Sequence, residues 1–137
     1  KIKLRNPQHI NKHIVAADTI VVLEGNILGK PANKAEAIAS LSALSGKTHR
    51  VITGVVLIYN GKEYTFSETT LVTFNLLTLD QIEYYVENYK PYDKAGGYAI
   101  QEWIGVVGIQ SIQGDFYNVM GLPVSKLLQK IKQLEEA

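Results

Sequence analysis

Residues 50–75 have the sequence RVITGVVLIYNGKEYTFSETTLVTFN, which predicts two long β-strands joined by a tight turn. The first strand covers residues 50–59 and is rich in β-branched and apolar side chains. Asn60-Gly61 is the strongest short-range signal for a two-residue hairpin turn, because both residue types tolerate positive φ angles. The return strand covers about residues 62–75. The stretch therefore predicts a long β-hairpin.

Shorter elements flank this hairpin on both sides. Upstream, the apolar run at residues 14–23 predicts a strand buried on both faces, and the turn Glu24-Gly25-Asn26 predicts a short return strand at residues 27–28. Residues 34–45 predict a helix, with Asn33 as its N-cap and Gly46 just past its end.

Downstream, residues 78–81 have the form of a capping box, which predicts a second helix ending near residue 90. Residues 103–112 predict a strand with a bulge at its glycines, and residues 116–120 predict a short final strand. Pro123 opens a closing helix whose predicted inward stripe is Val124, Leu127, Leu128, Ile131 and Leu134. The order of elements predicts a single α/β (α+β) domain, with a mixed, twisted sheet flanked by helices.

Composition excludes several classes of protein. The chain has 137 residues, no cysteine, and 14 Lys and Arg against 13 Asp and Glu, which gives a net charge of +1. A balanced charge argues against binding to a nucleic-acid polymer or a membrane surface, and no apolar run approaches the ~20 residues that span a bilayer. The lack of cysteine fits a cytoplasmic location.

Polar residues interrupt the apolar elements at a few places. Asp18 lies inside the first strand run, where an unpaired buried carboxylate would be costly, and this favours a functional role. Judged by itself, Lys30 is expected to be a solvent-exposed loop lysine. Glu68 is the only charge on its face of the return strand and also fits a strand end facing water. Lys30 and Glu68 gain weight only if they converge with Asp18.

Residues 91–101, PYDKAGGYAIQ, place Asp93, Lys94, two glycines and Gln101 in one loop. An acid, a lysine and glycine-loop amides together suit a metal-assisted phosphate site, since Mg²⁺ needs few carboxylates when phosphates supply the other oxygens. A side-chain amide such as Gln101 suits the edge of a nucleobase. The loop also fits a plain surface turn.

Histidine and serine chemistry has little support. His9 and His13 stand four residues apart but without helical periodicity, which disfavours a zinc pair. His49 is expected to face solvent at a strand start. The serines near the first helix have no histidine partner by pattern, so a serine nucleophile is not predicted.

Several motifs together resemble the Maf family of nucleoside-triphosphate pyrophosphatases, once described as septum-formation inhibitors. They are the segments at residues 17–19, 29–31, 44–46, 51–55, 68–70, 93–101 and 114–123. The resemblance runs from about residue 14 to the C-terminus and implies a Maf and inosine-triphosphatase-like fold with a nucleotide cleft. Residues 14–137 would form this domain, and residues 1–13 a polar lead-in, the remnant of a truncated N-terminal part.

The resemblance implies a house-cleaning hydrolase that converts dTTP, UTP and modified pyrimidine triphosphates to the monophosphate and pyrophosphate. Asp18 matches the family's catalytic acidic residue, which acts as proton acceptor, and would also hold the divalent metal, Mg²⁺ or Mn²⁺. Lys30 matches a phosphate-contacting lysine, and Thr19 and Gln101 match specificity positions. Glu68, Asp93 and Lys94 are secondary candidates. The chain is also expected to form a homodimer.

The chain departs from the family pattern in two respects. The Ser-x-x-Arg-Arg motif that opens the family is absent, which predicts that this chain alone would lack activity although its parent would be an enzyme. Gly97 and Ala99 stand where the family more often has Ala and Gly. The alternative is a nucleotide-binding regulator of cell division that has lost hydrolysis.

Overall fold

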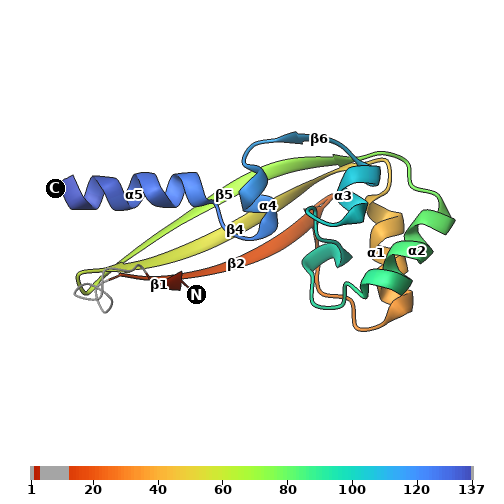
Figure 1. The fold of residues 1–137 in the computed structure, drawn as a ribbon, viewed down its shortest axis with the longest axis horizontal. Coiled ribbons are helices and arrows are strands. Elements are labelled where there is room, and N and C mark those ends of the chain that lie inside the picture. The colour runs from red at the N-terminus through yellow and green to blue at the C-terminus, as the bar shows by residue number, and fades with distance from the viewer. Residues whose placement is uncertain (1, 4–12, 137) are drawn as a thin grey trace.

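The computed structural model describes residues 2–3 and 13–136 and shows a twisted antiparallel sheet with helices at both ends and beside its middle (Figure 1). The strands are β1 (Ile2–Lys3), β2 (His13–Leu23), β3 (Asn26–Leu28), β4 (Thr48–Tyr59), β5 (Lys62–Phe74) and β6 (Ile109–Gln113). The helices are α1 (Lys34–Leu44), α2 (Leu79–Tyr89), the short 3₁₀ turn η2 (Ala95–Gly97), α3 (Trp103–Gly108), α4 (Phe116–Met120) and α5 (Val124–Glu136).

The predicted hairpin forms the middle of the sheet. β4 and β5 pair along their whole length, from Thr48 opposite Thr73 to Tyr59 opposite Lys62. Asn60 and Gly61 have φ angles of 51° and 80°, as the two-residue turn requires. The strand order is β1-β2-β4-β5-β6, with β3 paired to β2.

The predicted α+β class is confirmed, but the predicted mixed sheet is wrong for the part of the chain that the structure describes. Every strand pairing there is antiparallel. The reason is the connections, because the long strands follow one another through hairpins or return from the same end of the sheet, and no helical crossover links parallel neighbours.

Two hydrophobic clusters lie along the sheet. The larger one joins α1 and α2 to the sheet at one end and includes Leu41, Leu44, Phe74, Tyr85 and Ile104. The smaller one packs α5 against the other end of the strands and includes Val15, Val55, Leu57, Leu127 and Ile131. Figure 1 shows α1, α2 and α3 at one end of the long strands and α5 beside the opposite end.

The two predicted helices before residue 91 are confirmed. Asn33 caps α1 by accepting a hydrogen bond from the Glu36 amide at 2.9 Å. Thr78 and Gln81 form the predicted capping box of α2. Local chemistry alone specifies both helix starts.

The predicted strand at residues 103–112 is wrong in its first half. Residues Trp103–Gly108 form helix α3, and only Ile109–Gln113 form a strand. A Cβ at Gly105 would lie 1.7 Å from the Ile100 carbonyl oxygen, so this glycine permits a close approach between α3 and the backbone of the preceding loop, and it does not mark a bulge in a strand.

The predicted final strand at residues 116–120 is also wrong, because these residues form helix α4. The Asp115 side chain accepts a hydrogen bond from the Tyr117 amide at 2.8 Å and so caps the helix. The closing helix α5 is confirmed, but its inward side is narrower than predicted. Leu127 and Ile131 are buried, whereas Val124 and Leu128 are exposed.

The lead-in predicted for residues 1–13 lies mostly outside the described residues, as does His9. Ile2 and Lys3 form β1 and pair with Val15 and Ile14 of β2. Over residues 2–3 and 13–136, no helix has both the length and the apolar character needed to cross a membrane.

Candidate functional site

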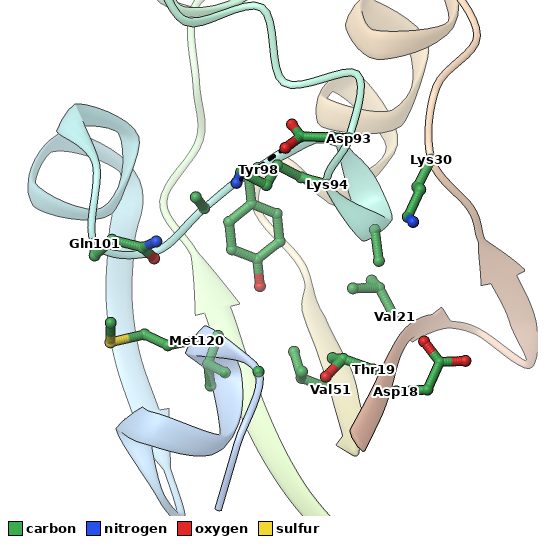
Figure 2. A pocket seen from close by; sticks show the side chains of 14 residues that line it. Asp18, Thr19, Val21, Lys30, Val51, Asp93, Lys94, Tyr98, Gln101 and Met120 are labelled. Atoms are coloured by element: carbon green, nitrogen blue, oxygen red, sulfur yellow. Dashed lines mark hydrogen bonds and ion pairs between the residues drawn. The ribbon is translucent and has the colours of Figure 1, made fainter. Parts of the chain in front are cut away.

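A pocket of about 200 Å³ opens between the sheet and the loop that follows α2 (Figure 2). Its walls come from β2, the segment after β3, β4, the 93–101 loop and the end of α4. The lining residues are Asp18, Thr19, Val21, Lys30, Val51, Asp93, Lys94, Ala95, Tyr98, Ala99, Gln101, Val119, Met120 and Gly121. The pocket therefore gathers segments that lie far apart in the chain.

The structure brings together every predicted site residue except one. Asp18, Thr19, Lys30, Asp93, Lys94 and Gln101 all line this pocket. Glu68 does not line it. The Glu68 carboxylate lies 3.3 Å from the Lys126 ammonium of α5, beside a different surface hollow. The condition set for Lys30 and Glu68, that they converge with Asp18, is therefore met by Lys30 and not by Glu68.

Asp18 occupies a different environment from the one expected. β2 is buried at its two ends, but residues 16–18 are exposed, so the prediction of a strand buried on both faces is wrong for its centre. Asp18 therefore carries no desolvation penalty that a function would have to explain. Its position in the pocket is what retains it as a candidate.

The charges of the pocket are distributed unevenly. Figure 2 shows Lys30 and Asp18 on one side and Gln101 and Met120 on the opposite side, with Tyr98 between them. Lys94 lies 3.4 Å from the Asp93 carboxylate. Among the described residues, neither Asp18 nor Lys30 forms an ion pair. Both charges are therefore available to a ligand.

The glycine loop holds Lys30 in place by its backbone. Gly96 has a φ angle of 72°, and a Cβ there would lie 3.1 Å from Val21, so glycine fits this close approach to β2. Its amide donates a hydrogen bond to the Gly29 carbonyl at 3.2 Å. The Gly97 amide donates to the Lys94 carbonyl at 3.0 Å. These two amides are therefore committed within the protein, and the expectation that they face phosphate is wrong.

A buried aromatic group supports the middle of the pocket. The prediction that His49 faces solvent is wrong, because its side chain is 1% exposed and stacks on Phe74. The Tyr98 hydroxyl lies 2.5 Å from His49 Nε2. Burial lowers the pKa of His49 to about 4 and raises the pKa of Tyr98, so both groups are neutral at pH 7.

Tyr85 of α2 holds the segment that leads to Gln101. Its hydroxyl donates to the Glu102 carboxylate at 2.6 Å and accepts from the Ala99 amide at 3.1 Å. Burial, together with the bond to Glu102, raises the pKa of Tyr85, so the hydroxyl keeps its proton. Tyr85 thus binds the Ala99 backbone and the Glu102 side chain, which lie on either side of the pocket-lining Gln101.

A polar network lies beneath Thr19, and sequence reasoning missed it. Thr19 stands directly opposite Thr53 of β4, and their hydroxyl oxygens are 2.8 Å apart. Thr53 donates to the backbone carbonyl of Asn118 at 3.2 Å. The Asn118 amide in turn donates to the carbonyls of Val51 and Glu68 and to Thr70 Oγ1. The sequence signal for this network was that Thr53, Thr70 and Asn118 lie in the motif segments at residues 51–55, 68–70 and 114–123.

The pocket offers carboxylate oxygens that could bind a metal ion. No group of three or more His, Cys, Asp and Glu side chains able to hold a metal occurs within residues 2–3 and 13–136. Asp18 and Asp93 nevertheless both line the pocket. One or two carboxylates are the usual protein contribution to a Mg²⁺ site that shares its ion with substrate phosphates.

Comparison with known proteins shows the family to which the chain is similar. The family model described as Maf-like protein matches residues 1–134. The chain is 50% identical over 124 residues to the dTTP/UTP pyrophosphatase of Porphyromonas gingivalis, which covers 90% of this chain and 62% of that protein. It is 52% identical over 130 residues to the dTTP/UTP pyrophosphatase of Phocaeicola vulgatus, covering 95% and 67%.

A third relative, the dTTP/UTP pyrophosphatase of Cytophaga hutchinsonii, is 54% identical over 121 residues, covering 88% of this chain and 56% of the relative. The chain thus spans between 56% and 67% of the length of these curated relatives. The family match extends over nearly the whole chain, and it agrees with the motifs that meet in the pocket. The chain belongs to the Maf-like protein family.

Proposed function

We propose that this chain carries the nucleotide site of a pyrophosphatase that hydrolyses dTTP, UTP and modified pyrimidine triphosphates to the monophosphate and pyrophosphate. One observation carries the proposal: Asp18, Lys30 and Gln101, from three distant segments, line a single pocket. The names of the relatives at about 50% identity support the same substrate class.

The side of the pocket with Lys30 suits the phosphates. Lys30 supplies a positive charge for non-bridging phosphate oxygens, and Lys94 adds a second one on the same loop as Asp93. Asp18 orients the attacking water and accepts its proton. The water oxygen then forms a bond to the α-phosphorus. The bond from that phosphorus to the oxygen that bridges the α- and β-phosphates breaks, and this oxygen leaves with the pyrophosphate. Positioning and electrostatics suffice, so no covalent intermediate is required.

Mg²⁺ or Mn²⁺ fits this donor set, because Asp18 offers an exposed carboxylate and Asp93 a second one in the same pocket. When bound, the ion would neutralise charge on the phosphates. Asp18 would hold it, and the substrate phosphates would supply further oxygen ligands.

The opposite side of the pocket suits the base. Tyr98, Val119 and Met120 supply apolar and aromatic surface, and the Gln101 amide provides hydrogen-bonding groups at its edge. We assign Gln101 and Thr19 to base selection.

The test is pyrophosphate release from dTTP and UTP, measured on this chain and on a form extended to the length of its relatives. Asp18→Asn in the extended form should lower kcat at least about 100-fold, which is the usual contribution of a positioned acid or base. Glu63→Gln is the matched control, because Glu63 is an exposed carboxylate on β5 that does not line the pocket. Equal turnover by Asp18→Asn and Glu63→Gln would remove Asp18 from the mechanism.

The alternative is a nucleotide-binding regulator without hydrolysis. It predicts that triphosphates raise the thermal stability of both forms while neither form releases pyrophosphate. Measurable pyrophosphate release by the extended form decides against it.

A further inference from the structure

The hydroxyl groups of Thr19 and Thr53 form a short chain that ends on a backbone carbonyl. Thr19 Oγ1 lies 2.8 Å from Thr53 Oγ1, and Thr53 Oγ1 lies 3.2 Å from the Asn118 carbonyl oxygen. Thr53 is 0% exposed, whereas Thr19 is half-buried and lines the pocket. Only Thr19 can therefore meet a ligand.

The number of hydrogens on each hydroxyl fixes which group donates in each of these hydrogen bonds. A carbonyl oxygen only accepts, so Thr53 must be the donor in its bond to Asn118. A hydroxyl has one hydrogen, which leaves Thr53 as the acceptor in its bond to Thr19. Thr19 must then donate its hydrogen to Thr53. The lone pairs of Thr19 remain, so this hydroxyl can only accept a hydrogen bond from anything bound in the pocket.

The location of Thr19 indicates which part of a nucleotide it meets. A Cβ at Gly121 would lie 4.0 Å from Thr19 Oγ1, so this hydroxyl faces the end of α4 next to Met120. Met120 and Gln101 lie on the side of the pocket away from Lys30 (Figure 2). This is the side suited to the base.

We infer that Thr53 is a specificity-positioning residue: by accepting the Thr19 hydrogen, it makes Thr19 select a base that offers an N–H donor. The inference rests on the proposed function and deepens it. At N3, uracil and thymine carry an N–H, whereas cytosine carries an unprotonated nitrogen that faces Thr19 as a second acceptor. The Gln101 amide is suited to the carbonyls beside that N–H.

The size of the preference follows from the cost of reversing the hydrogen bond between Thr19 and Thr53. To donate to cytosine, Thr19 must rotate its hydrogen away from Thr53, and the partly buried hydrogen bond between the two threonines is lost. A lost hydrogen bond of this kind is worth about a tenfold change in affinity. The protein should therefore bind UTP about tenfold more tightly than CTP.

The experiment is calorimetric titration of this chain with UTP and with CTP in the same buffer, and the readout is the ratio of the two dissociation constants. Thr53→Val removes the acceptor with little change in side-chain volume and should bring the ratio to within about twofold of unity, because the Thr19 hydrogen is then free to turn to either base. Thr53→Ser keeps the hydroxyl and should keep the ratio. Thr53→Ala is the second variant if Thr53→Val does not fold.

Thr48→Val provides a matched control. Thr48 and Thr73 form another cross-strand threonine pair between β4 and β5, with hydroxyl oxygens 2.7 Å apart, and neither residue lines the pocket. Its loss should leave the UTP to CTP ratio unchanged.

Each other outcome overturns a specific claim. A Thr53→Val or Thr53→Ala ratio equal to that of the unmodified chain refutes the inference, and so does an equal loss of affinity for both nucleotides. Tight binding of UTP and CTP without preference by the unmodified chain refutes the inference but leaves the proposed function. Failure of the unmodified chain to bind any triphosphate refutes the proposed function and the inference with it.

Discussion

Acidification should destabilise the protein through His49. The imidazole is 1% exposed, and its Nδ1 has no hydrogen-bond partner among the described residues. A protonated ring would need acceptors for both N–H groups, so burial favours the neutral form and lowers the pKa from its ordinary 6.5 to about 4. The unfolded chain therefore binds a proton at a higher pH than the folded chain.

The direction and size of the effect follow from linkage. Between pH 6.5 and pH 4 the unfolded state carries more protons at this position, so the free energy of unfolding rises with pH in that window and levels off above it. With a pKa of about 4 in the folded state, the loss relative to pH 7.5 is about 2 kcal/mol at pH 5 and about 3 kcal/mol at pH 4.

The assay is urea denaturation of the unmodified chain and of His49→Gln at pH 7.5 and pH 5. Glutamine is uncharged at both pH values and can still bond to the Tyr98 hydroxyl. The other titrating groups act in both proteins, so the difference between the two pH dependences isolates His49. We expect the unmodified chain to lose about 2 kcal/mol more than His49→Gln. Equal losses in the two proteins would refute the burial argument.

Three further substitutions test the supports of the pocket. Tyr85→Phe removes a bond to a buried backbone N–H and one to a carboxylate, so it should lower the free energy of unfolding by about 2 kcal/mol in urea denaturation and weaken nucleotide binding. Gly105→Ala places a Cβ 1.7 Å from the Ile100 carbonyl oxygen and should lower the free energy of unfolding by about 3 kcal/mol in thermal denaturation. Gly54→Ala is the control, because its Cβ would meet no atom within 4 Å and the loss of stability should be far smaller. Asn118→Ala removes the side-chain donor to the Val51 and Glu68 carbonyls and should lower the free energy of unfolding by about 2–4 kcal/mol in the same assay. A loss below about 1 kcal/mol would contradict the role of this network.

Several parts of the fold could be predicted because their signals are local. Asn60-Gly61 takes the positive φ angles of a two-residue turn, and Glu24 and Gly25 do the same at the smaller hairpin. The caps at Asn33 and Thr78 set the starts of α1 and α2. Each of these features depends on side chains within four residues of the backbone they bind.

The region from residue 103 to residue 120 could not be predicted in the same way. Its apolar runs are short, and a short apolar run fits a buried helix turn as well as a strand. Contacts with residues outside the run decide between them, such as the approach of Gly105 in α3 to the backbone of Ile100. The Asp115 cap of α4 was a local signal that the apolar pattern concealed.

The sequence indicated most of the candidate site as residue types and motifs, since all the proposed residues except Glu68 line one pocket. It misjudged their environments, because the exposure of Asp18 and the burial of His49 depend on how the loop and helices pack on the sheet. Local rules of turns, caps and alternation operate over a few residues and are written in the chain itself. The direction of the Thr19 hydroxyl is different, because it depends on a carbonyl that lies 65 residues beyond Thr53 and reaches it only through the fold.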